Sequence, residues 1–143
     1  METELIQKSR QFAEKAFERL PKEYVYHNFG HTAEVAQAAE EIGRANQLSD
    51  EDLETVMVAA WLHDVGFVKG CSNHELQSAL DAEKVLADAG ASPEKIQQVK
   101  QAIEATRMPQ QPRNLVEQVL CDADLYHLSN GNLEEAAQRL QQE

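Results

Sequence analysis

Cysteine is scarce in this chain, and long apolar runs are missing. The two cysteines, Cys71 and Cys121, lie far apart and show no CxxC spacing, so they form no disulfide framework and suit a reducing compartment. The N-terminal segment METELIQKSR is charged and lacks the apolar run of a signal peptide. No stretch approaches the roughly 18 to 20 apolar residues that span a bilayer. These absences predict a cytoplasmic protein without a membrane partner.

Positive charge is also in short supply. The sequence has 13 lysines and arginines against 25 aspartates and glutamates, a formal net charge of −12. A phosphate backbone is bound by neutralising it with Lys and Arg, and no basic cluster is present, which argues against a nucleic-acid polymer as partner. A small anionic substrate stays open, because one bound cation reverses the local field of an acidic protein.

The chain contains no repeat, no low-complexity tract and no linker rich in Pro, Gly or Ser. No segment alternates with period two for long enough to form a strand. Its 143 residues suit one domain with a substantial core. We therefore predict an all-α fold, a compact single-domain bundle of about six to seven helices over residues 1–143.

Apolar side chains recur at three- and four-residue spacings, which is the period of a helix face. Local signals mark the boundaries: Pro21 and Gly90 end helices, while Ser49 and the Ser92-Pro93 pair begin them. The expected helices cover residues 5–20, 29–46, 50–62, 74–89, 93–107, 115–128 and 133–140.

The third expected helix is apolar nearly all round, which is typical of a buried helix. His63 and Asp64 follow at its inner end. Both side chains are costly to desolvate unless something pairs with them. A divalent metal ion does this well, since imidazole and carboxylate are ligands for ions of the Mg, Mn, Fe and Zn class. For this pair alone, a capping or hydrogen-bonded role is the competing interpretation.

Two further groups strengthen the metal interpretation. His27 and His31 are four residues apart, so on a helix they lie on one face. Asp122 and Asp124 are two carboxylates in an otherwise apolar stretch that we expect to be buried.

The ordered set His31, His63-Asp64 and Asp124 resembles the signature of the HD superfamily of metal-dependent phosphohydrolases. The resemblance covers about residues 24–130 and includes further motifs: Tyr26-His27-Asn28 before His31, Ala60-Trp61-Leu62-His63-Asp64-Val65-Gly66, His74-Glu75, and Asp122-Ala123-Asp124-Leu125. The first of these is also similar to an element of the cyclic-nucleotide phosphodiesterases, distant members of the same superfamily. Family members continue past the final expected helix, whereas this sequence ends at Glu143, so we expect either a short protein or a shortened chain.

The resemblance implies that His31, His63, Asp64 and Asp124 are the metal ligands. Asp64 is also implied in catalysis, as the carboxylate able to bridge to a second ion. Asp122 is the competing choice for the last ligand and otherwise a supporting or surface group. Asp124 is preferred because the family motif places its ligand directly before a helical stretch that starts with Leu or Arg.

Three other side chains are candidates for roles at the site, and only the role of His27 comes from the resemblance. His27 matches the general acid of the phosphodiesterases. His74 is a candidate for a substrate phosphate contact or for support of a second ion, with a helix cap as the alternative. Arg107 is a candidate phosphate contact, with a solvated arginine at a helix end as the alternative.

The function implied is hydrolysis of a phosphoester in a small molecule, with a nucleotide as the expected case. The cofactor is a divalent ion, and Mn, Mg, Fe, Co, Ni and Zn are not distinguished by these residues. The alternative is a non-catalytic regulatory module that binds a metal or a nucleotide. A purely structural ion is disfavoured, because structural sites usually have closed, Cys-rich shells. The sequence leaves the oligomeric state undetermined.

Overall fold

The computed structural model describes residues 2–18, 29–66, 74–107 and 110–125. They form six helices: α1 (Glu4–Phe17), α2 (Phe29–Ala45), α3 (Asp50–Leu62), α4 (His74–Asp88), α5 (Pro93–Ala105) and α6 (Leu115–Asp124). No strand occurs in these residues, and the predicted all-α fold is confirmed. The helix expected over 133–140 lies outside the described residues.

The predicted helix boundaries follow from local hydrogen bonds. Ser49 Oγ accepts from the N–H of Asp52 at 3.1 Å, and Ser92 Oγ accepts from the N–H of Lys95 at 3.1 Å, so both predicted N-caps are confirmed. Gly90 has φ +82°, the left-handed conformation that commonly ends a helix. These local contacts explain why α3 begins at Asp50, why α4 ends at Asp88 and why α5 begins at Pro93.

Several helices end earlier than the sequence predicted. The first ends at Phe17, with Glu18 as its C-cap, and the second and fourth end one residue early, at Ala45 and Asp88. The fifth ends at Ala105, with Thr106 as its C-cap, rather than at residue 107. The sixth ends at Asp124, with Leu125 as its C-cap at φ −95° and ψ 4°. Residues 126–128 of that expected helix lie outside the described part of the chain. At the end of α6 the apolar pattern of the sequence runs on past the point where the backbone leaves the helix, so periodicity alone does not locate the end.

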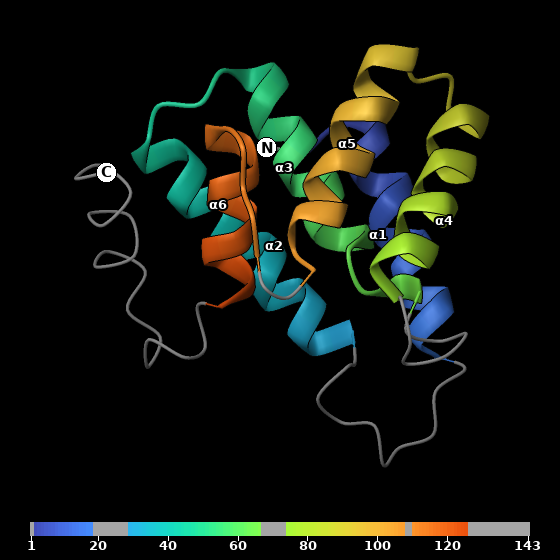
Figure 1. Cartoon of the computed structure of the whole chain (residues 1–143). Helices are drawn as coiled ribbons and strands as arrows, with labels where there is room; N and C mark the ends of the chain where they lie inside the picture. Colours follow the sequence, from blue (N-terminus) through green and yellow to red (C-terminus); the bar gives the residue numbers. More distant parts are fainter. Residues whose placement is uncertain (1, 19–28, 67–73, 108–109, 126–143) are drawn as a thin grey trace.

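Helix α3 lies at the centre of the bundle and packs against all five of the others (Figure 1). Helices α2 and α6 contact each other on one side of it, and α4 and α5 form a second pair. The prediction of a buried central helix is confirmed: its buried residues are Leu53, Thr55, Val56, Met57, Val58, Ala59, Ala60, Trp61 and Leu62. A helix that is apolar on all faces can be covered only by neighbours on every side.

Buried Lys95 anchors the start of α5 to the start of α3. Its Nζ donates to the carbonyl oxygen of Glu51 and to Thr55 Oγ1, both at 2.8 Å, and lies 3.1 Å from Glu54 Oε1. A buried ammonium needs such partners because it has lost its water. The N-terminal end of α3 is therefore held in place by polar contacts as well as by packing.

The lower end of the bundle in Figure 1 gathers chain segments that are far apart in sequence. The first turns of α2 and α4 lie there, together with the last turns of α3, α5 and α6. Within the described residues, none of the helices combines the length and apolar character that a membrane span requires. The fold thus brings to one end the segments that carry the predicted site residues.

Candidate metal centre

Four side chains converge at this lower end. His31 stands in the first turn of α2, His63 and Asp64 follow α3 directly, and Asp124 is the last residue of α6. One ligand atom from each lies within 4.8 Å of all the others. These are the same four residues that the family resemblance implies as ligands. The structure brings them together, and their role as ligands stays a prediction.

His63 is the most enclosed member of this cluster, with 1% of its surface exposed. Its Nδ1 lies 2.7 Å from the carbonyl oxygen of Ala60, which can only accept, so Nδ1 carries a proton. Its Nε2 lies 3.1 Å from Asp124 Oδ1 and 3.3 Å from Asp64 Oδ2. A backbone contact at one ring nitrogen that aims the other at a metal position is typical of ligand histidines.

The electrostatics of this contact indicate a cation site. Burial lowers the pKa of His63, but the charges and hydrogen bonds of Asp64 and Asp124 outweigh it and raise the pKa well above the ordinary 6.5. In the metal-free protein Nε2 is therefore protonated, and its N–H donates a hydrogen bond to Asp124 Oδ1. That proton supplies the positive charge that two adjacent carboxylates need, and a divalent ion could replace it.

The donor set fits a divalent ion. Two imidazoles and two carboxylates suit Mg, Mn, Fe or Zn class ions, and no sulfur is among the four. The nearby thiol of Cys121 is buried and donates to the carbonyl oxygen of Ala105 at 3.4 Å. Burial and the negative charge of Asp124 raise its pKa to about 12, so it stays protonated. His31 and Asp124 are half-buried, which leaves one side of the cluster open.

Two contacts that the sequence did not indicate hold the backbone around the cluster. The rings of Phe29 and Trp61 stack with centroids 5.4 Å apart and planes 21° from parallel. Each ring stands two residues before a histidine of the cluster, so the stack ties the start of α2 to the end of α3. Buried Ser78 on α4 accepts from the N–H of Gly66 at 2.8 Å, which fixes the turn after Asp64.

Asp122, the competing carboxylate, is not grouped with the other three ligand candidates. Two positions along an α-helix differ by about 200° in direction, since each residue turns about 100°. Asp122 and Asp124 on α6 therefore point to nearly opposite sides. Only one of the two carboxylates can face His63, and the packing of α6 selects Asp124.

The remaining site candidates are placed less completely. His27 lies outside the described residues. His74 begins α4, but its side chain is outside the described part of the structure, so its suggested roles stay predictions. Arg107 follows α5, is exposed, and lines a hollow of about 480 Å³ together with Glu75, Leu76 and Glu104.

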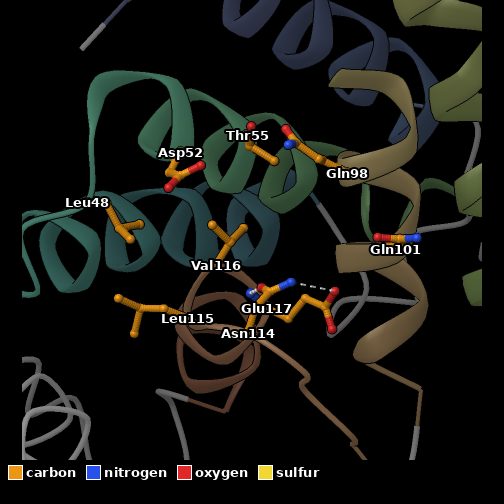
Figure 2. Close-up of a pocket in the computed structure, with 9 residues that line it drawn as sticks. All are labelled: Leu48, Asp52, Thr55, Gln98, Gln101, Asn114, Leu115, Val116 and Glu117. Atoms are coloured by element: carbon orange, nitrogen blue, oxygen red, sulfur yellow. Dashed lines mark hydrogen bonds between the residues drawn. The ribbon is translucent and has the colours of Figure 1, made fainter. Parts of the chain in front are cut away.

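A separate cavity of about 230 Å³ lies near the N-terminal ends of α3 and α6, away from the cluster (Figure 2). It is lined by Leu48, Asp52, Thr55, Gln98, Gln101, Asn114, Leu115, Val116 and Glu117. None of the predicted site residues is among them. Its carboxylate Glu117 is 2% exposed and accepts from Asn114 Nδ2 at 3.2 Å and from the N–H of Arg113 at 3.0 Å. These bonds lie at the start of α6, and none of them involves a residue of the cluster.

A family model described as the HD domain matches residues 28–129, which is most of the chain. This chain belongs to the HD domain family. The match spans all four residues of the cluster and confirms the resemblance stated from the sequence motifs. At the level of the family it supports a metal-dependent phosphohydrolase.

Among solved structures, the HD domain chain is similar to a predicted HD superfamily hydrolase from an uncultured Thermotogales bacterium. The TM-score is 0.73 at 20% sequence identity, over 95% of this chain and 84% of the other. At this identity the likeness shows the shared fold alone. No curated protein matches the chain.

The first prediction separates the two carboxylates of α6. Asp124→Asn keeps the shape of the side chain but removes the charge that faces His63, so we expect Mn²⁺ affinity to fall. The loss should exceed the roughly 10- to 100-fold cost of losing an outer-shell partner. Asp122→Asn, the matched control, should bind within a few-fold of wild type. Calorimetric titration with Mn²⁺ measures both, and the reverse order would make Asp122 the ligand.

The second prediction concerns protons. Because the pKa of His63 is raised well above 6.5 in the metal-free protein, the ring is protonated at neutral pH and must lose that proton when a metal ion binds to Nε2. Affinity for Mn²⁺ should therefore increase with pH up to the raised pKa. Titrations in two buffers of different ionisation enthalpy should show release of about one proton per ion. Binding without proton release would mean that Nε2 does not take part.

Proposed function

We propose that this HD domain protein hydrolyses a phosphoester in a small molecule, with a nucleotide as the expected case. The divalent ion would be held by His31, His63, Asp64 and Asp124. The observation that carries the proposal is the convergence of these four donors, from three separate segments, within 4.8 Å of one another. On this proposal the partner is a small molecule in the cytoplasm, and neither a nucleic-acid polymer nor a membrane.

A divalent ion at such a centre supplies a Lewis acid that polarises a phosphoryl oxygen and lowers the pKa of bound water. The residues of the chain would hold and orient the reacting groups. His63 and Asp64 form the enclosed wall, with 1% and 9% of their side chains exposed, whereas the Asp124 side chain is 21% exposed. Substrate would approach from the side of Asp124 and half-buried His31. Asp64 is the carboxylate that we propose to bridge to a second ion.

The charge of the substrate also bears on the proposal. Asp64 and Asp124 repel an anion, so the bound ion must reverse the local field. Arg107 follows α5, whose last turn lies at the same end of the bundle (Figure 1), and it lines the 480 Å³ hollow. We keep Arg107 as a proposed phosphate contact. The competing interpretation is an arginine solvated at a helix end.

A regulatory module that binds a metal or nucleotide without turnover is the second candidate. The same four residues would serve it. The feature that favours an enzyme is the set of four ligand candidates together with His27, because a module without chemistry has no need for an acid at that position.

The third prediction tests turnover. With Mn²⁺ added, the protein should hydrolyse bis(p-nitrophenyl) phosphate, followed as release of p-nitrophenolate. Asp64→Asn should reduce the rate to background because it removes a ligand charge while preserving side-chain shape. Asp88→Asn changes an exposed carboxylate at the end of α4 and should leave the rate unchanged. If wild-type protein binds Mn²⁺ but turns over neither this ester nor a panel of nucleotides, the regulatory module is favoured instead.

The fourth prediction concerns His27 as the acid that protonates the leaving-group oxygen. An unperturbed histidine titrates near pH 6.5, which suits proton donation. His27→Ala should keep its metal but lose roughly 10²- to 10⁴-fold in rate on an ester with a poor leaving group. The loss on p-nitrophenyl esters should be much smaller, since that leaving group needs little protonation. Loss of the ion would make His27 a ligand, and unchanged rates on both esters would make it structural.

A further inference from the structure

The two oxygens of the Asp124 carboxylate have different partners. Oδ1 lies 3.1 Å from Nε2 of His63 and faces the cluster. Oδ2 accepts from Nε2 of Gln110 at 3.4 Å. Gln110 belongs to the segment between α5 and α6, outside the helices expected from the sequence. One oxygen of the carboxylate therefore faces the cluster, and the other accepts a hydrogen bond from the segment between α5 and α6.

The chain that follows Gln110 is anchored to both helices. Next to it, the N–H of Gln111 donates to the carbonyl oxygen of Ala105 at 3.3 Å, at the end of α5. Further along, the N–H of Arg113 donates to Glu117 Oε1 at 3.0 Å, in the first turn of α6. Because the chain next to it is held to both helices, half-buried Gln110 can reach the last turn of α6 at a lower entropy cost than a residue of a free loop.

The chemistry of an amide suits this position. A neutral N–H donor orients a carboxylate without cancelling its charge, so Asp124 stays an anionic ligand. A lysine or arginine there would form an ion pair and compete with the metal ion for the same carboxylate. Outer-shell donors to metal-binding carboxylates act in this way in many metal sites.

We infer that Gln110 is a positioning residue of the metal centre, which holds Oδ2 of Asp124 so that Oδ1 is presented to the ion. This inference rests on the proposed role of Asp124 as a ligand. It does not require the protein to be an enzyme. Gln110 acts through Asp124 and has no part in the chemical step.

Removal of the amide tests the inference. Gln110→Leu keeps the bulk of the side chain and removes the donor, and calorimetric titration should show Mn²⁺ binding about tenfold weaker. Gln111→Leu, at the exposed neighbouring position, is the matched control and should bind as wild type does. The melting temperature of the metal-free protein should be the same in all three. The rise in melting temperature at a fixed Mn²⁺ concentration should be smaller for Gln110→Leu alone, because ligand stabilisation follows affinity.

Unchanged Mn²⁺ affinity in Gln110→Leu would overturn the inference, as would equal destabilisation of that variant with and without Mn²⁺. Since all of these measurements follow metal binding, failure of the turnover experiment leaves the inference intact, whereas wild-type protein that binds no Mn²⁺ overturns both.

Discussion

His63 lies with its imidazole buried between the carboxylates of Asp64 and Asp124, and the other parts of the centre are arranged around that contact. Each charged group removed from water carries a desolvation penalty of roughly several kcal/mol, which attraction to a shared counter-charge can offset. Here one cation, a proton or a metal ion, serves both carboxylates. The contact forms only when α3 and α6 are packed, because Asp124 is 61 residues from His63 in the chain.

The apolar character of α3 makes this convergence feasible. A helix buried on all faces is surrounded by its neighbours, so the residues that follow its last turn emerge among the ends of other helices. His63 and Asp64 are the first polar residues after that apolar stretch. The Phe29–Trp61 stack and the Ser78–Gly66 hydrogen bond then fix the two backbone segments beside them. Stability of the core and geometry of the centre thus depend on the same helix.

Fold and function rest on different observations in this protein. The likeness to the Thermotogales structure concerns the arrangement of helices, and one fold can serve several chemistries. What favours hydrolysis is the site itself: nitrogen and oxygen donors, an enclosed wall at His63 and an open side at Asp124. The cavity of Figure 2 differs from this site. Its buried carboxylate, Glu117, already accepts hydrogen bonds from Arg113 and Asn114.

The sequence alone determined the helical class, the buried third helix and the caps at Ser49, Gly90 and Ser92, because caps and periodicity depend on contacts within one or two turns of chain. It also indicated His63-Asp64 as a costly pair at the end of an apolar helix. Its preference for Asp124 over Asp122 came from a family motif, and in the structure Asp124 is the carboxylate of α6 that lies beside His63. Only the tertiary structure revealed Ser78, Gln110 and the Phe29–Trp61 stack as supports of the centre. Such contacts depend on how distant helices pack, and no local pattern in the chain encodes that.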